Sequence, residues 1–383
     1  MTFRAVVLPR SRALAEQLLR VPWPILLVAA AIAGCGAVAL YSVAGGSLHP
    51  WAERHVLRFL IAAGIALAIA LIPIRTWIAA AYPLYLMALV LLALVPLLGV
   101  DALGARRWLS LGGFSLQPSE IMKLALILAL ARYYHWLPAT KRSRPQWVVL
   151  PLAMVAVPML LTLRQPDLGT AILLATIGLG IVFLAGVSPL YFIAGAAGIA
   201  VAWPYALARL HDYQRRRIEI FLDPDQDPLG AGYHITQSKI AVGSGGTEGK
   251  GFLQGTQSQL DFVPEKHTDF IFTMIGEEWG FSGSLALLCL YGILLGLLLW
   301  IAFSCRHQFG RLLISGAALM IFVYLFINIA MVAGLVPVVG IPLPLVSYGG
   351  TSMFVVLLAL GLAMGAHVHR DELLRPEDTG AWW

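Results

Sequence analysis

Charged residues are scarce in this sequence. Asp, Glu, Lys and Arg make up 12% of its 383 residues, whereas roughly 25% is usual for a soluble domain. Hydrophobic residues make up 59%, more than a soluble surface could cover with so few charges. The composition therefore excludes the disordered and disulfide-rich classes and indicates a chain that is solvated mainly by lipid.

Cysteine is also scarce, and we expect no cleavable signal peptide. The three cysteines are odd in number and lie in apolar or cytoplasmic-looking stretches, so they imply no disulfide framework. Residues 1–21 hold four arginines, and their apolar run from Ala5 to Leu8 is too short for a signal sequence. We therefore expect the first long apolar run, Val21 to Val43, to be a retained membrane helix.

Ten apolar runs predict an all-α polytopic membrane protein that forms a single transmembrane domain over residues 1–383. Continuous apolar runs of this length are typical of membrane helices rather than of barrel strands. The runs lie at 21–43, 56–74, 77–99, 119–137, 147–163, 168–187, 189–209, 270–302, 312–335 and 345–368. Because the number of spans is even, both termini should lie on one side of the membrane.

The basic residues favour a cytoplasmic position for the two tails, 1–21 and 369–383. In this orientation the inner segments hold Arg4, Arg10, Arg12, Arg20, Arg75, Lys141, Arg142, Arg144, Arg306, Arg311, Arg370 and Arg375. The short outer loops hold only Arg54, Arg58, Arg106, Arg107 and Arg164. Such an excess of Lys and Arg marks the cytoplasmic side of a membrane protein.

The segment 210–268 is then a single large extracytoplasmic loop. A loop of this length is usually functional or disordered, and recurring hydrophobic residues such as Tyr233, Ile235 and Phe252 argue against disorder. Its glycine-rich stretch 243–251 is not a P-loop, because Ser244 and Gly251 stand where that motif needs glycine and Ser or Thr. We predict an ordered, functional loop.

Glu120 and Lys123 lie inside an expected span, where an ionisable group costs roughly 2.5–3.5 kcal/mol on insertion scales. They are three residues apart, so they share a helix face and can pair. One interpretation is a structural ion pair at a helix start, with Ser119 as the cap. The other is that Lys123 faces a polar cavity and binds an anion, with Glu120 orienting it. The sequence leaves both open.

Two further features lie at the edges of expected spans. Asp167 directly precedes one, which is the usual position of a helix N-cap. The segment 333–350 contains Pro337, Pro342 and Pro344, which prevent a regular helix. Irregular backbone at membrane depth is tolerated only where it is buried in protein or lines a cavity. We expect this segment either to wall a polar cavity or to form a rigid turn between two spans.

Asp269 is the strongest candidate for a catalytic residue, because it lies where the long loop enters a span. Four ionisable residues crowd this membrane edge: Glu265, Lys266, His267 and Asp269. A helix cap alone would not need the charged neighbours. An acid at a partly dry interface has a raised pKa unless cations lie close to it. The cations that could keep this acid ionised are Lys266, Lys123, Arg106 and Arg107. We predict that Asp269 is a general base facing the outer leaflet.

Five blocks of the sequence together resemble the SEDS family, the shape, elongation, division and sporulation proteins. They are Gly104–Trp108, Gln117–Glu120, Gln165–Thr170, Gly255–Phe272 and Pro342–Gly350. The blocks occur in family order, and the resemblance extends over about residues 25–370. Two stretches, 227–235 and 255–259, are more similar to elongation members than to division members.

The resemblance implies a peptidoglycan glycosyltransferase that acts during cell elongation in the bacterial cytoplasmic (inner) membrane. Such proteins polymerise lipid II, a disaccharide-pentapeptide on undecaprenyl diphosphate, at the outer face and release undecaprenyl diphosphate. It also implies as partners the nascent glycan strand, a class B penicillin-binding protein (a transpeptidase) and rod-complex proteins such as MreC and MreD, with no nucleic acid. The essential aspartate of the family falls on Asp269, its arginine on Arg107 and its lysine on Lys123.

The charge pattern suggests how such a site would work. The reaction joins a sugar 4-hydroxyl to the anomeric carbon of a lipid-diphosphate donor with inversion, so one carboxylate base suffices. Cations would stabilise the diphosphate leaving group. The substrate-binding candidates are Arg107, Lys123, Glu120, Lys239, Arg106, Lys266 and Asp167. We expect no resident metal site, although Mg²⁺ or Mn²⁺ could accompany the diphosphate.

A lipid II flippase is the alternative, and a non-catalytic scaffold is a weaker one. A flippase needs a polar path across the whole membrane. Here the charges inside the expected spans cluster toward the outer side, which favours the enzyme. A scaffold would not need Asp269 with cations around it.

Overall fold

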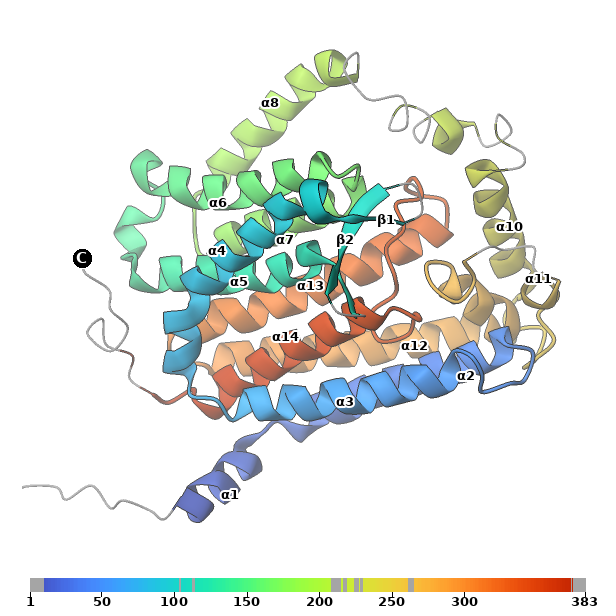
Figure 1. Cartoon of the computed structure of the whole chain (residues 1–383), viewed down its shortest axis with the longest axis horizontal. Coiled ribbons are helices and arrows are strands. Elements are labelled where there is room, and N and C mark those ends of the chain that lie inside the picture. The colour runs from blue at the N-terminus through green and yellow to red at the C-terminus, as the bar shows by residue number, and fades with distance from the viewer. Residues whose placement is uncertain are drawn as a thin grey trace, which may run out of the picture.

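The computed structural model describes residues 10–102, 105–111, 114–207, 215, 219–223, 227, 230–260, 265–372 and 374. Ten long helices lie within these residues. They are α2 (Trp23–Val43), α3 (Ala52–Ala70), α4 (Ile74–Leu98), α5 (Pro118–Trp136), α6 (Pro145–Leu163), α7 (Leu168–Leu184), α8 (Pro189–Leu207), α12 (Ile271–Ser304), α13 (Gln308–Val332) and α14 (Gly350–Val368). Nine of them pack together in a bundle, and α8 extends away from it (Figure 1). Each of the ten helices coincides with one of the ten apolar runs, so the predicted fold class is confirmed.

The helices differ in how readily lipid could accept them. By length and composition, α2, α4, α6, α12, α13 and α14 are each long and apolar enough to cross a membrane. In contrast, α3 and α5 each carry three charged residues. Apart from Ile121, the helix α5 is buried from Ser119 to Ala131, so protein rather than lipid surrounds Glu120 and Lys123. This part of α5 can lie within a membrane because the other helices shield it.

Small residues bring the last helix close to α3. A Cβ on Gly361 would lie 2.7 Å from the carbonyl oxygen of Ala66, and a Cβ on Gly365 would lie 3.2 Å from the Cα of Ala70. Without a hydrophobic driving force between helices in lipid, such close backbone approach provides the van der Waals contact that holds them together. The C-terminal helix is therefore packed inside the bundle rather than at its edge.

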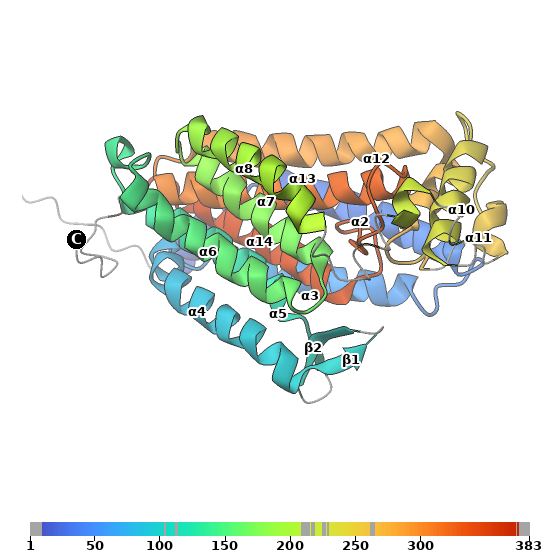
Figure 2. The same ribbon diagram turned by 90° about the horizontal axis from the view of Figure 1, so that it is seen from above.

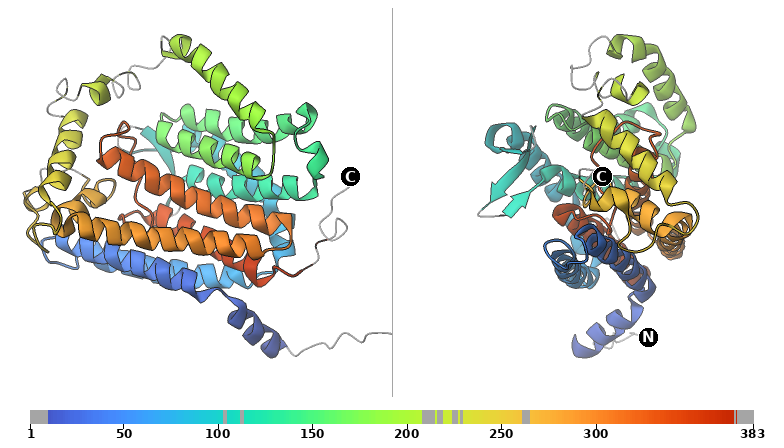
Figure 3. Two further views of the ribbon diagram at one scale, coloured as in Figure 1. Left: turned by 180° about the vertical axis from the view of Figure 1, so that it is seen from behind. Right: turned by 90° about the vertical axis from the view of Figure 1, so that its right-hand side faces the viewer.

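The two ends of the bundle differ. A short helix α1 (Arg10–Arg20) and the end of α14 lie at one end (Figures 1 and 3). The other end carries α10 (Ala231–Ser244), α11 (Thr256–Gln259) and an antiparallel sheet of β1 (Val100–Ala102), β2 (Ala105–Leu111) and β3 (Phe114–Leu116), as Figure 2 shows. The apolar pattern did not predict these strands. Much of 208–229 and all of 261–264 lie outside the described residues.

The helix α12 is broken at Gly280, whose φ of 65° and ψ of −160° are not helical. The glycine-rich stretch of the long loop fills the break. The amide of Lys250 donates to the carbonyl of Glu277 (3.0 Å), and the amide of Phe281 donates to the carbonyl of Gly246 (2.9 Å). This stretch thus satisfies backbone groups that the break frees, as lipid-solvated structure requires. The glycine-rich stretch therefore attaches the long loop to α12, which agrees with the conclusion that it is not a P-loop.

Replacing Gly280 by alanine should destabilise the protein. A Cβ there would clash with the backbone nitrogen of Gly249, and the left-handed φ alone is strained by roughly 1–3 kcal/mol for a non-glycine residue. We expect a clearly lower melting temperature in detergent. The matched control is Gly292→Ala in the same helix, where a Cβ would meet nothing within 4 Å. Equal melting temperatures for the two variants would contradict this account of the break.

Candidate functional site

Asp269 lies in the turn 265–270 that leads into α12. The N-cap position of that helix is Phe270, and no side chain caps it, so capping does not explain Asp269. The side-chain amide of Asn328 on α13 donates to the backbone carbonyl of Asp269 (2.8 Å) and to that of Ile341 (2.7 Å). A Cβ on Gly340 would lie 3.3 Å from the Asp269 Oδ2. The carboxylate is therefore held against the proline-rich segment.

The surroundings of Asp269 disfavour its ionised form. Burial, with the negative charge of Glu265 as the second cause, raises the pKa of Asp269 to about 6. Within the described residues the carboxylate has no ion-pair partner, because Lys123 and Arg107 pair with other acids. Two of the four cations expected to keep Asp269 ionised, Lys123 and Arg107, are thus paired with other acids. A carboxylate of this pKa is basic enough to accept a proton and is still mostly ionised at neutral pH.

The proline-rich segment 333–349 is irregular, as its prolines predict, and it is buried at Ile341 and from Leu343 to Ser347. The Ser347 hydroxyl donates to the carbonyl of Thr268 (2.6 Å) and accepts from the amide of Leu343 (2.7 Å). The amide of Tyr348 donates to the carbonyl of His267 (2.9 Å). These bonds attach the segment to the turn that carries Asp269. Because its three prolines exclude regular helix, α14 begins at Gly350, five residues later than the apolar run.

Two hollows open beside this turn, at the α2–α3 connection. Lys266, His49, Trp51 and Gln259 help to line a polar cleft of about 380 Å³. An apolar groove of about 750 Å³ runs between α2 and α3, near the connection that joins them. Its lining includes Tyr41, Leu48, Val56, Leu57, Leu60 and Phe252. The ring of His267 stacks on Trp51 at 4.7 Å, which ties the polar cleft to the Asp269 turn.

Glu120 and Lys123 form a buried ion pair. The Lys123 Nζ lies 2.6 Å from the Glu120 Oε1, with Lys123 fully buried. The hydroxyl of Tyr324 on α13 contacts the Lys123 Nζ and lies 2.9 Å from the Glu120 Oε2. The structure thus contains the ion pair of the first interpretation, while anion binding by Lys123 stays a prediction. Ser119 is not the cap, because α5 begins at Pro118 and its N-cap residue is Gln117.

Arg107 and Asp167 meet near the start of α5, where the side-chain amide of Gln117 also approaches Asp167 at 3.5 Å. The Arg107 Nε lies 3.9 Å from the Asp167 Oδ2, and its guanidinium donates to the carbonyls of Gln165 and Pro166. Asp167 is the N-cap of α7, as expected, and accepts from the amide of Thr170 at 3.1 Å. Arg106, its neighbour on β2, is exposed. The pair therefore fixes the hairpin to the start of α7.

The end of α13 brings most of the predicted residues together. Tyr324 and Asn328 are one turn apart, so the same helix holds the Glu120–Lys123 pair and Asp269. A Cβ on Gly169, just after Asp167, would lie 2.9 Å from the carbonyl oxygen of Val339. The side chain of Lys239, exposed on α10, lies over Gly334 at the start of the proline-rich segment. These residues lie at one end of the bundle, around the end of α13 and the proline-rich segment.

Glu277 and Glu278 hold the loop rather than face this region. The carboxylate of Glu277 is fully buried and lies 2.6 Å from the Lys250 Nζ and 3.0 Å from the amide of Gln257. Glu278 accepts from the Ser42 hydroxyl at 2.5 Å. Both acids therefore fasten α11 and the glycine-rich stretch to α12 and α2.

Sequence reasoning missed Tyr324, Ser347 and Trp51. Tyr324 had a weak signal, since it places a phenol four residues before Asn328 in an otherwise apolar run. Ser347 and Trp51 had none, because their partners lie 79 and more than 200 residues away. Only the folded chain brings such partners together.

Comparisons with known proteins agree with this architecture. The family model described as "Cell cycle protein" (FTSW_RODA_SPOVE) matches residues 22–372. The peptidoglycan glycosyltransferase MrdB of Escherichia coli is 44% identical over 355 residues, which are 91% of this chain and 94% of that protein. The probable peptidoglycan glycosyltransferase FtsW of Trichlorobacter lovleyi is 37% identical over 353 residues, 89% of this chain and 91% of that protein.

Two solved structures are similar over nearly the whole chain. One comes from work on the structural coordination of polymerization and crosslinking by a peptidoglycan synthase complex. It is 35% identical, with a TM-score of 0.78, and the match covers 91% of this chain and 98% of that chain. The other is the rod shape determining protein RodA of Thermus thermophilus. It is 31% identical, with a TM-score of 0.66 and coverages of 91% and 97%.

The Glu120–Lys123 pair predicts an asymmetric response to mutation. Glu120→Ala leaves the Lys123 charge buried without its partner, which should cost roughly 3–5 kcal/mol of stability. The double variant Glu120→Leu/Lys123→Met removes both charges and should be more stable than the single variant. Thermal unfolding in detergent measures this. The control is Glu53→Ala, which breaks an exposed pair with His49 and should cost at most about 1 kcal/mol. A double variant less stable than Glu120→Ala would contradict the prediction.

Proposed function

This chain belongs to the FtsW/RodA/SpoVE family of cell cycle proteins, and we propose that it is a peptidoglycan glycosyltransferase that polymerises lipid II during cell elongation. The identity to MrdB over 91% of the chain supports the activity. The observation that carries the mechanism is the carboxylate of Asp269, which is buried at the outer edge of the bundle, has no ion-pair partner among the described residues and is not used as a helix cap.

Asp269 is the general base in this proposal. A sugar hydroxyl is a weak nucleophile at neutral pH, and a positioned base accelerates its attack by roughly 10²–10⁴-fold. The hydrogen bond from Asn328 fixes the backbone of Asp269, and the turn is attached to the proline-rich segment on its other side. The carboxylate accepts the proton of the acceptor 4-hydroxyl as the oxygen attacks the anomeric carbon. The leaving diphosphate departs from the opposite face, so the product is inverted and no covalent intermediate is needed.

The two hollows beside Asp269 match an amphiphilic donor. The polar cleft with Lys266 suits the sugar and diphosphate, and the apolar groove between α2 and α3 suits a polyprenyl chain. Charge that develops on the leaving diphosphate would be stabilised by nearby cations. We assign that role to Lys266, Lys239 and Arg107, with Arg106 and Lys123 as further candidates. A divalent cation, Mg²⁺ or Mn²⁺, would enter with the diphosphate.

The distribution of basic residues supports a location and an orientation for the protein. We place the protein in the bacterial cytoplasmic membrane with both termini in the cytoplasm, because the basic residues concentrate at that end. The site is then at the outer face. We propose a class B penicillin-binding protein as the crosslinking partner, which the similarity to a peptidoglycan synthase complex supports, and rod-complex proteins such as MreC and MreD as further partners.

Removing the base should abolish polymerisation without unfolding the protein. We expect Asp269→Asn to reduce glycan synthesis from labelled lipid II by roughly 10²–10⁴-fold, with and without the cognate penicillin-binding protein. Asp223→Asn, in the exposed part of the long loop, should keep wild-type activity. Full polymer from a folded Asp269→Asn variant would exclude Asp269 as the base. No polymer from the wild type with its partner would favour a flippase, which a lipid II translocation assay would detect.

The raised pKa of Asp269 predicts an acidic limb in the pH profile. The base must be deprotonated, so kcat/KM should be constant above the pKa of about 6 and fall about tenfold per pH unit below it. Glu265→Gln removes the nearby negative charge that helps to raise this pKa. It should therefore shift the limb to lower pH, whereas Glu248→Gln, a charge change on an exposed residue, should not. A limb that does not move with Glu265→Gln would speak against this assignment.

A further inference from the structure

A groove at the opposite end of the bundle has the composition of a headgroup site. Its volume is about 360 Å³, and it lies between the start of α2, the end of α12 and the end of α14. Its lining includes Arg20, Ile25, Leu297, Trp300, His367 and Arg370. The apolar residues come from the helix walls, and the basic residues come from the helix ends. The groove is thus apolar along the helices and basic where it leaves the bundle.

The charge at the mouth of the groove is positive. Arg20 has no ion-pair partner within the described part of the chain and is exposed. Arg370 lies 3.7 Å from Asp371, which Arg306 also approaches at 3.4 Å. Two guanidinium groups, those of Arg306 and Arg370, therefore share this carboxylate, and Arg20 adds a third positive charge without an acid partner among the described residues. The mouth retains positive charge that a phosphate could neutralise.

His367 orients Arg370 at the mouth of the groove. The Arg370 Nη1 lies 2.6 Å from the His367 Nε2. Because a guanidinium can only donate, Nε2 must accept. His367 is 6% exposed, so it holds the Arg370 guanidinium from within the bundle. The remaining donors of that guanidinium can then bind a ligand oxygen.

The local structure places this mouth at a membrane surface. Trp23 donates from its indole nitrogen to the carbonyl of Leu18 (3.1 Å), which fixes the corner between α1 and α2. Next to it, Leu19 on α1 is 83% exposed. An apolar side chain on a short helix that ends in arginine, beside interfacial Trp23 and Trp300, is typical of a segment lying in the lipid headgroup region.

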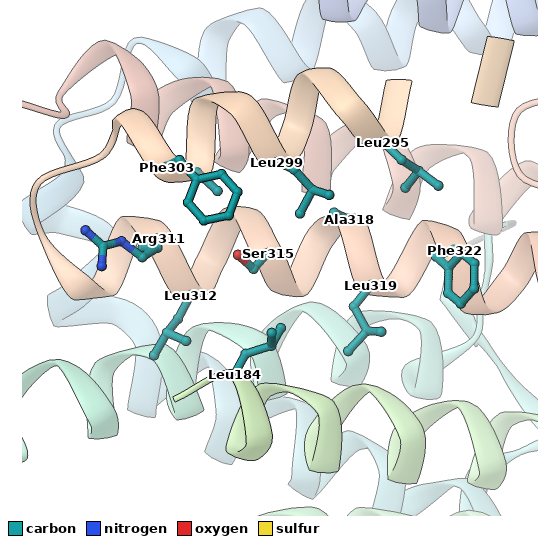
Figure 4. Close-up of a pocket in the computed structure, with 11 residues that line it drawn as sticks. Leu184, Leu295, Leu299, Phe303, Arg311, Leu312, Ser315, Ala318, Leu319 and Phe322 are labelled. Atoms are coloured by element: carbon teal, nitrogen blue, oxygen red, sulfur yellow. The ribbon is translucent and has the colours of Figure 1, made fainter. Parts of the chain in front are cut away.

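A second groove on the other side of α12 gives a useful contrast (Figure 4). It has a similar volume, about 360 Å³, and is lined by leucines and phenylalanines of α7, α12 and α13. Its only basic lining residue is Arg311, which donates to the carbonyl of Cys305 at 3.3 Å. Acyl chains of any lipid could fill this groove. The groove at Arg20 and Arg370 instead has charge that discriminates between lipids.

We propose that the groove formed by Arg20, Trp300, His367 and Arg370 binds one anionic phospholipid of the leaflet that faces both termini. The phosphate lies between the Arg20 and Arg370 guanidinium groups and accepts hydrogen bonds from both. One acyl chain lies along Ile25, Leu297 and Ile301. The choice of the cytoplasmic leaflet rests on the orientation given under Proposed function, but the binding itself does not depend on the glycosyltransferase activity.

Native mass spectrometry of the full-length chain tests this with two probes, dioleoyl phosphatidylglycerol and dioleoyl phosphatidylcholine. We expect one retained phosphatidylglycerol, bound at least tenfold more tightly than phosphatidylcholine. Arg20→Gln/Arg370→Gln should remove this preference, and Arg20→Lys/Arg370→Lys should keep most of it. Arg144→Gln changes an exposed arginine at the start of α6 and should behave as the wild type.

Several results would overturn the proposal. Equal binding of the two lipids by the wild type, or an unchanged preference in the double glutamine variant, would do so. Displacement of the lipid by glycerol 3-phosphate would show that a soluble phosphate suffices. A second measurement needs no arginine variants. It records how far phosphatidylglycerol with brominated acyl chains quenches the tryptophan fluorescence of the protein. The quenched fraction of fluorescence should fall in Trp300→Phe but not in Trp147→Phe, and the absence of that difference would also contradict the site.

Discussion

Backbone that leaves regular helix inside a lipid-solvated bundle must find its hydrogen-bond partners within the protein. The end of the bundle that carries Asp269 contains several irregular segments, so it depends on this requirement. Asn328 binds the carbonyls of Asp269 and Ile341, Ser347 joins two irregular segments, and the glycine-rich stretch closes the break at Gly280. The same bonds that make irregular backbone tolerable also hold Asp269 in place. The bonds that satisfy the backbone and the bonds that position the Asp269 carboxylate are therefore the same.

The polar residues around Asp269 are organised as pairs that are satisfied separately. Glu120 with Lys123, Arg107 with Asp167, and Glu277 with Lys250 each bring an acid and a base together, whereas Asp269 has no such partner among the described residues. A lone buried carboxylate has a raised pKa, because burial penalises its charged form. The pKa of Asp269 is thus raised by burial and by the charge of Glu265, and among the described residues no paired cation lowers it.

The sequence was sufficient to predict the ten helices, because a helix that spans lipid needs a long apolar run. It also singled out Asp269 and the Glu120–Lys123 pair, since lipid penalises such residues. It failed where distant segments decide the outcome. The pairing of Arg107 with Asp167 depends on a hairpin that the apolar pattern does not reveal. Two of the cations predicted to lie around Asp269, Arg107 and Lys123, are paired with other acids. The two hollows at the α2–α3 connection were also beyond prediction, because they depend on side chains from several helices.

The position of Lys123 has a consequence for the biosynthesis of the protein. Its acid partner is on the same helix, three residues earlier, whereas Tyr324 is 204 residues beyond Glu120. When α5 leaves the ribosome, the hydroxyl that completes the cluster does not yet exist. A charge at the centre of a lone helix costs roughly 2.5–3.5 kcal/mol on insertion. Pairing within α5 lets this segment partition into the bilayer as a locally neutral unit, long before its final neighbour is translated.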